Sequence, residues 1–473
     1  MLRPQNSCQT PSREVVARRQ RRGARAAGAC AVAALLFLVA TSAAAQQVGR
    51  IDYQTYTLAN GLTVVLSEDH TTPIVTVNVW YHVGSANERA HRSGFAHLFE
   101  HMMFQGSAHV KKSEHMQLVE RAGGSMNGST REDRTNYFET LPSNRLNLGL
   151  WLEADRMRSL AVTQATFENQ RQTVKEERRL SVDNQPYSKA FQDGLTLPFD
   201  STTCFAYAHT VIGDMADLDS AKVEDVQDFF HRYYAPDNAV LTVVGDFAPA
   251  EARRLIQQYY GGIPRVETTA PVSCDYRYGT GERRMEVTDN NANLPLVALI
   301  YKAPAESEAD APALELLISI LGDGESSRIN RSLVREQRAA LQAGAFADLR
   351  RKAGVVIVYG IDNQGVPAAR VESLLTAEVD RARTDTISEA ELTKAKNQYR
   401  AGAIRQRQTT MGVAEALQNA LWYDGELSAA NDDVPRHLAV TTADLARVAQ
   451  KYLVSANRLV LIDNPPSGRG ASQ

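Results

Sequence analysis

The chain has 473 residues, of which 43% are hydrophobic and 23% charged, a composition typical of a globular protein long enough for two packed cores. A formal net charge of −3 excludes a strongly basic protein and argues against nucleic acid as a partner. Disorder of the whole chain is also excluded, because disordered chains contain too few hydrophobic residues to form a core.

The first 45 residues differ from the rest. Seven arginines and one acidic residue, Glu14, give this segment a net charge of +6, and a short hydrophobic run follows at 29–40. A basic start, a short apolar centre and a small-residue site predict a secretory signal peptide, cleaved after Ala45, and thus a periplasmic or secreted protein. A membrane anchor is the alternative, but the run is too short to span a bilayer. The long basic segment leaves open a translation start inside it.

Removal of this leader changes the net charge from −3 to −9, because the leader carries +6. The mature chain therefore offers no basic surface for nucleic acid, and no membrane span is expected after cleavage. Of the four cysteines, only Cys204 and Cys274 remain. They can pair in an oxidising compartment or stay as two separate buried thiols, and their sequence separation does not decide between these alternatives.

The mature chain begins with a hairpin pattern at residues 56–66, in which Asn60-Gly61 supplies the positive φ angles of a tight turn. A strand rich in β-branched residues is expected at 74–83, two short strands with a polar turn at 123–130 and 133–139, and another strand at 239–244. Helical patterns cover residues 94–104, 146–158, 167–182 and 223–234. This mixture predicts an α+β fold.

The second half of the chain repeats the first. Residues 233–241 resemble 452–460 at an offset of 219, and residues 77–81 resemble 298–302 at an offset of 221. Two distant pairs with nearly the same offset indicate a duplicated domain. The expected organisation is a signal peptide (1–45), a catalytic domain (46–264), a linker (265–273), a homologous domain (274–465) and a flexible tail (466–473).

His97 and His101 are four residues apart in the helical segment 94–104, so on a helix they share one face and can bind one metal ion. Glu100 lies beside them, and the order H-x-x-E-H matches the motif of inverted zincins. A catalytic zinc takes three protein ligands and keeps one position for water, so a third ligand has to come from elsewhere. Two solvated surface histidines are the alternative, but the neighbouring residues are hydrophobic, and burying this pair without partners would be costly.

The helix at 167–182 is the candidate source of the third ligand. Its residues 170–177 resemble the E-R-x-x-V-x-x-E pattern of the insulinase/pitrilysin family, which includes the mitochondrial processing peptidases. The resemblance implies Glu177, 76 residues after His101, as the third zinc ligand. Glu176 is the neighbouring alternative. Because one helical residue turns the side chain by about 100°, only one of the two can face the metal.

Gln170 stands where many members of this family carry a second glutamate. Glutamine still forms hydrogen bonds but carries no charge, so we expect it to support a metal ligand and to shift metal affinity or rate. Phe167, Val174 and Leu180 are expected on the inner face of the same helix.

A second segment is also similar to the family. Residues 123–130 resemble the pattern G-G-x-x-N-A-x-T, whose strand edge receives the substrate as an added strand. The resemblance implies that Asn127 contacts the substrate backbone. Gly128 stands where alanine is commoner, and we expect it to loosen the edge. An ordinary hairpin is the alternative.

The resemblance covers residues 51–463. It implies an α+β fold of two homologous domains, each a mostly antiparallel sheet packed with helices, arranged as half of a clamshell. It also implies a metalloendopeptidase with a single Zn²⁺ per chain, Glu100 as general base, and peptides or unfolded polypeptide segments as substrates. A dimer with itself, or with a homologous subunit lacking the metal motif, is implied as well.

Two further expectations complete this interpretation. A non-catalytic or weakly active partner or scaffold subunit is the rival function, since the family also contains members that assemble without cleaving. The second domain is expected to bind no catalytic metal, because the offset of 221 aligns Ile318 and Gly322 with the two histidines, and neither side chain can bind zinc.

Overall fold

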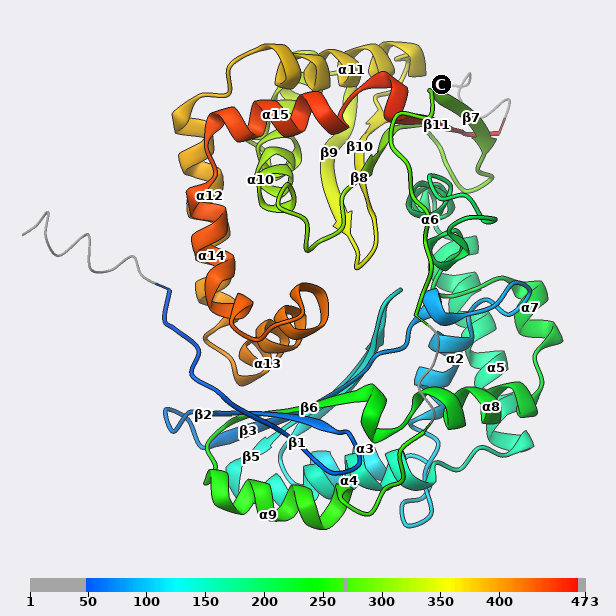
Figure 1. Cartoon of the computed structure of the whole chain (residues 1–473). Coiled ribbons are helices and arrows are strands. Elements are labelled where there is room, and N and C mark those ends of the chain that lie inside the picture. The colour runs from blue at the N-terminus through cyan, green and yellow to red at the C-terminus, as the bar shows by residue number, and fades with distance from the viewer. Residues whose placement is uncertain (1–47, 267–270, 467–473) are drawn as a thin grey trace, which may run out of the picture. The chain divides into compact units, whose positions relative to one another are not determined.

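Two sheets, each with helices packed against it, make up the described part of the chain (Figure 1). The computed structural model describes residues 48–266 and 271–466. The predicted signal peptide lies outside these ranges, as do most of the expected tail and part of the expected linker. By its contacts the chain divides into Met1–Gly49 and Arg50–Gln473, so both sheets belong to one unit, and the expected domain boundaries within it remain predictions.

The first sheet has the strand order β1-β2-β6-β3-β5-β4. Its strands are β1 (Gln54–Thr57), β2 (Thr63–Glu68), β3 (Ile74–Tyr81), β4 (Ser125–Thr130), β5 (Thr135–Pro142) and β6 (Ala239–Gly245). Neighbouring strands are antiparallel except β2 and β6, which run parallel. All the strands expected from the sequence in this half are therefore present.

The second sheet has the order β7-β11-β8-β10-β9. Its strands are β7 (Arg283–Thr288), β8 (Leu296–Ala303), β9 (Ala340–Leu349), β10 (Gly354–Asp362) and β11 (Arg458–Asn464). Here too one pair, β7 and β11, is parallel and the others are antiparallel. This order repeats β2-β6-β3-β5-β4, which confirms an α+β fold built from two homologous, mostly antiparallel sheets.

The helices divide between the two halves. Those of the first half are α2 (Phe95–Met102), α3 (Glu114–Arg121), α4 (Leu146–Ser159), α5 (Gln164–Arg178), α6 (Ser188–Thr196), α7 (Met215–Ser220), α8 (Val223–Tyr233) and α9 (Pro249–Tyr260). Those of the second half are α10 (Ala311–Gly322), α11 (Ala368–Thr384), α12 (Glu389–Gln406), α13 (Thr410–Asn419), α14 (Ala429–Ala439) and α15 (Thr442–Tyr452). No helix within the described residues is both long and hydrophobic enough to cross a membrane.

Each half contributes one helix to the sheet of the other. Helix α6 packs on the second sheet, where Ala190 joins Ile300 and Ile357 in one buried cluster. Helix α13 packs on β3 and β6 of the first sheet, where Leu417 is buried with Val240. The two halves therefore interlock. Next to α6, Cys204 and Cys274 form a disulfide, which decides between the two alternatives left open by the sequence.

Two local expectations were wrong in detail. In the first turn only Gly61 has a positive φ angle, because the Leu58 N–H donates to the Leu62 carbonyl at 2.9 Å and closes a three-residue loop, which needs a left-handed residue only at its last position. Leu180 is 58% exposed rather than on the inner face, because α5 ends at Arg178 and a π-helical turn changes the helical phase after it.

Candidate metal centre

The three predicted ligands lie together where α2 packs against α5. Helix α2 places both imidazoles on one face, with ring centroids 4.8 Å apart. Near the end of α5, Glu177 points at both rings. Its Oε2 is 3.2 Å from Nε2 of His101, and its Oε1 is 3.7 Å from Nε2 of His97. Glu176 points away and pairs with Arg179 at 2.9 Å, so only one of the two competing carboxylates faces the histidines.

This donor set fits zinc. Two ligands about 2.0–2.1 Å from a tetrahedral zinc lie roughly 3.3 Å apart, a value that the separations of 3.2 and 3.7 Å bracket. Gln170 supports the fit, since its Oε1 is 3.3 Å from Nδ1 of His101. A hydrogen bond donated by Nδ1 keeps its own proton on that nitrogen, so Nε2 is the atom that would give up its proton to bind a metal ion between the ligands.

Burial and mutual contacts shift the ionisation of these groups. Desolvation lowers the pKa of His97 to about 4, and the neighbouring His101 adds to this effect. Burial also opposes protonation of His101, but its hydrogen bond to Glu177, the charges of Glu177 and Glu100, and its hydrogen bond to Gln170 together outweigh burial and raise the pKa of this imidazole. The same hydrogen bond lowers the pKa of Glu177. A neutral imidazole and an ionised carboxylate are the forms that bind a cation.

Glu100 lies beside the ligands without joining them. Thr130, at the end of β4, donates a hydrogen bond of 2.5 Å from its hydroxyl to Oε2 of Glu100. Burial raises the pKa of Glu100, while the Thr130 hydrogen bond opposes this shift. A carboxylate with a raised pKa is better matched to proton transfer near neutral pH. Glu100, His97, Thr130 and Glu177 all line one cavity of about 400 Å³.

The edge strand β4 borders this cavity. It pairs only with β5 among the described strands, and Asn127 is exposed on it. A Cβ atom at Gly128 would lie 3.1 Å from Cδ1 of Tyr137 and 3.3 Å from Cζ of Phe104. The two aromatic rings therefore fill the space that a larger residue would need, which gives Gly128 a packing role.

A buried carboxylate fixes the start of α2. Glu88 accepts hydrogen bonds from the backbone N–H groups of Gly94 and Ala96, at 2.9 and 2.7 Å. His209 Nε2 is 3.0 Å from the same carboxylate. Burial opposes the charge on His209, but the Glu88 contact outweighs it and raises the pKa of His209. Local sequence spacing gives no signal for this contact, because it joins residues 121 positions apart.

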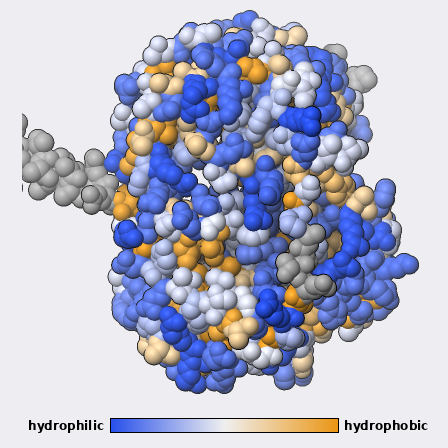
Figure 2. Space-filling view, in the orientation of Figure 1, coloured by the Kyte–Doolittle hydropathy of each residue, from blue (hydrophilic) through white to orange (hydrophobic). Residues whose placement is uncertain are grey.

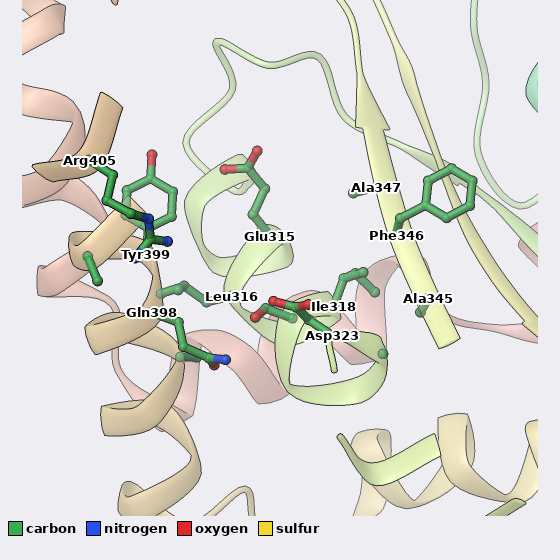
Figure 3. A pocket seen from close by; sticks show the side chains of 14 residues that line it. Glu315, Leu316, Ile318, Asp323, Ala345, Phe346, Ala347, Gln398, Tyr399 and Arg405 are labelled. Carbon is green, nitrogen blue, oxygen red and sulfur yellow. The ribbon is translucent and has the colours of Figure 1, made fainter. Parts of the chain in front are cut away.

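The second half holds a larger cavity of about 600 Å³ at the equivalent place, between α10, α12 and β9 (Figure 3). Ile318 and Gly322 line it, as the repeat offset predicts. Within residues 48–266 and 271–466, the groups of side chains suited to a metal both lie in the first half. Of the predicted ligands, His97 and Glu177 line the smaller cavity.

The other group with metal-binding side chains comprises His115, Glu139 and Glu153, all of them buried, with Glu153 on α4. Arg156 donates from Nε and Nη2 to both oxygens of Glu153. A guanidinium thus already supplies the positive charge in this cluster, which we interpret as a structural ion network.

Comparison with known proteins identifies the family of the chain. The family model described as "Insulinase (Peptidase family M16)" matches residues 63–198, and the "Peptidase M16 inactive domain" matches residues 220–399. The "Zinc protease PqqE" of Helicobacter pylori is 31% identical over 85% of this chain and 90% of that protein. A probable mitochondrial-processing peptidase subunit beta of Arabidopsis thaliana is 24% identical over 84% of this chain and 75% of that protein.

Solved structures give the same result. The crystal structure of a protease from Helicobacter pylori matches with a TM-score of 0.82 and 30% identity, covering 88% of this chain and all of that one. Both halves of the present chain are thus accounted for by one family. The chain belongs to the insulinase family of peptidases, peptidase family M16.

Proposed function

We propose that this protein is a zinc-dependent endopeptidase that hydrolyses peptides or unfolded polypeptide segments. The observation that carries the proposal is the convergence of His97, His101 and Glu177, with the free carboxylate Glu100 beside them. The names of the similar proteins in Helicobacter pylori and Arabidopsis thaliana agree with it. A scaffold subunit would have no need for a half-buried carboxylate next to a complete set of zinc ligands.

The ligands would hold one zinc ion, which when bound polarises the scissile carbonyl and lowers the pKa of water to about 7. Glu100 is placed to accept a proton from the attacking water and to return it to the leaving amine nitrogen. Thr130 holds Glu100, and Gln170 orients His101. Each protein group therefore has a role that its contacts support.

The edge of β4 is the proposed substrate site. A peptide added there as a further strand would bind through its backbone, with Asn127 within reach, and such binding favours extended chains over folded proteins. The face of the molecule seen in Figure 2 is mostly hydrophilic, with hydrophobic residues in small groups.

The test uses the full-length protein, its zinc content and internally quenched peptides of mixed sequence. The Glu100→Gln variant should keep zinc and lose turnover by about 10²–10⁴-fold, because a positioned base contributes that much to a proton transfer. Glu176→Gln, a control that changes an exposed carboxylate nearby, should behave as the wild type. Loss of zinc from Glu100→Gln would make this residue a ligand. Zinc without hydrolysis in the wild type, alone and with a homologous subunit, would favour the scaffold function.

We also infer that the protein is exported after removal of residues 1–45 and acts as a dimer, with itself or with a homologous subunit. The basic and hydrophobic leader supports export, and the disulfide between Cys204 and Cys274 suits an oxidising compartment. N-terminal sequencing of the periplasmic or secreted protein should give Gln46 as the first residue. A mature protein that keeps its leader and free thiols would contradict export.

A further inference from the structure

The turn between β4 and β5, residues 131–134, belongs to the first half but is held by the second. Nη2 of Arg350 is 3.2 Å from the carboxylate of Glu132. The backbone N–H of Arg351 donates to Asp133 Oδ2 at 3.0 Å, and the indole of Trp422 donates to the Asp133 carbonyl at 3.1 Å. Three residues of the second half thus hold the turn that follows the proposed substrate strand.

Glu415 on α13 adds a contact to the sheet itself. Its Oε1 accepts hydrogen bonds from Nδ2 of Asn78 (2.9 Å), Nε1 of Trp80 (3.3 Å) and Nδ2 of Asn136 (3.0 Å). These three side chains are at most 1% exposed. Without this carboxylate oxygen the donors of Trp80 and Asn136 would lack their acceptor on α13, and Asn78 would keep only a 3.9 Å contact with Sδ of Met411 there. An unmet buried donor is costly.

Two hydrogen bonds, joined by the backbone between Ser129 and Thr130, connect Asn136 with the proposed general base. Oδ1 of Asn136 accepts a hydrogen bond from the Ser129 hydroxyl at 2.7 Å. Arg134 donates from Nη1 to the Ser129 carbonyl at 2.8 Å. The next residue, Thr130, points to the opposite face of β4 and donates to Glu100. On one face of β4, Ser129 is connected through Asn136 to Glu415. On the other face, Thr130 donates to Glu100.

We propose that Glu415, in the half without metal ligands, is a positioning residue for the general base Glu100. It fixes Asn136 and Ser129, and through them the end of β4 that presents Thr130 to Glu100. The inference deepens the proposed peptidase function and rests on it. It gives the second half a specific part in the chemistry of the first.

Helix α13 provides a matched control. Gln418 lies one turn after Glu415 and also crosses between the halves, donating from Nε2 to the Val240 carbonyl at 3.1 Å. Val240 belongs to β6, which is separated from β4 by two strands. Gln418 also donates to the Asn78 carbonyl on β3 at 3.5 Å, so its removal weakens the joint between the halves at β3 and β6 but leaves the hydrogen bonds of Asn136, Ser129 and Thr130 in place.

The experiment compares full-length Glu415→Ala, Glu415→Gln and Gln418→Ala on internally quenched peptides. Glu415→Ala should lower kcat about tenfold or more with zinc content unchanged, as expected for a base moved from its reacting position. Glu415→Gln should restore most of kcat, because its amide oxygen can accept the same three hydrogen bonds. Gln418→Ala should lower the melting temperature and leave kcat at the wild-type value.

A double-mutant comparison tests the path. If Glu415 acts through Thr130, then Glu415→Ala combined with Thr130→Val should lose no more activity than the worse single variant. Fully additive losses would overturn the path, and equal kcat losses in Glu415→Ala and Gln418→Ala would reduce Glu415 to a structural role.

Hydrogen exchange on the metal-free protein gives a readout that needs no activity. Amides of Ser125–Thr130 should exchange faster in Glu415→Ala than in Gln418→Ala. Unchanged exchange together with wild-type kcat would refute the inference. If the wild type hydrolyses no peptide, the proposed function fails, while the exchange rates still decide whether Glu415 orders β4.

Discussion

Glu176 and Glu177 show that a shift of one residue along a helix determines which carboxylate faces the candidate metal centre. Both are carboxylates on one helix turn, yet Glu176 pairs with Arg179 and Glu177 faces the two imidazoles. We expect Glu177→Gln to lower zinc occupancy sharply, because a neutral amide is a poor zinc ligand and two histidines alone leave the site incomplete. Zinc content after dialysis against a weak chelator measures this. Glu176→Gln is the control, and the reverse outcome would show that the neighbouring carboxylate binds the metal.

At this scale the sequence identifies the residues whose spacing carries information. A histidine pair four positions apart is recognisable because the helix repeat places both side chains on one face. Thr130 belongs to the segment 123–130, which resembles the family pattern, but its contact with Glu100 does not follow from local spacing. The contact of Glu88 with the start of α2 does not follow from it either. Such contacts join distant segments, so the assembled fold is needed to find them.

At the scale of one element, helix α5 shows where hydrophobic periodicity stops predicting which side chains are buried. The expected helix at 167–182 is present as Gln164–Arg178, but the apolar pattern continued across a π-helical turn and misplaced Leu180. The structure of α6 and α13 was less predictable still. A helix that covers the sheet of the other half has the same amphipathic pattern as one that covers its own.

Histidine 437 joins three helices of the second half. Its Nε2 is 2.8 Å from Glu315 on α10, its Nδ1 is 3.2 Å from Asp433 on α14, and its ring stacks on Tyr399 of α12. Burial lowers the pKa of His437, but the two carboxylates outweigh burial and raise it to about 9. The imidazolium form therefore ties these helices together at neutral pH.

A raised histidine pKa predicts a loss of stability in base. The stabilisation is fully present below the unfolded-state pKa of about 6.5 and is lost as the pH rises through the folded-state pKa of about 9. The shift corresponds to at most about 3 kcal/mol. Urea unfolding measures the free energy of unfolding of the wild type and of His437→Gln at about pH 6.5 and about pH 9. Between these two pH values the free energy of unfolding should fall less in the variant than in the wild type.

The free energy of unfolding of His437→Gln should still fall somewhat as the pH rises. Glu306 and His437 line one cavity in the second half. Desolvation raises the pKa of Glu306 to about 8, so its ionisation also destabilises the fold as the pH rises. An equal pH dependence in wild type and His437→Gln would contradict the role assigned to His437.

For the whole molecule, the duplication could be inferred from two short sequence pairs, but the interlocking of the halves could not. The polar face of β3, with Thr76, Asn78 and Trp80, is covered by α13 from the second half. Thr76 bonds to Thr410 at 2.7 Å, and Asn78 bonds to Glu415. A first-half fragment would expose this face, so we expect residues 46–264 alone to be unstable.

Interlocked halves predict that the whole chain unfolds in one step. Leu417 belongs to the second half but is fully buried with Val65 and Val240 of the first sheet. Leu417→Ala should cost about 2–5 kcal/mol, as for other buried leucines, and should lower the stability of both halves together. Hydrogen exchange should then show β3 and β8 losing protection by the same amount. As a control, Leu333→Ala, buried in the core of the second half alone, should have the same effect on β3 if the halves are coupled. Loss of protection confined to β8 in this control would show that the halves unfold independently.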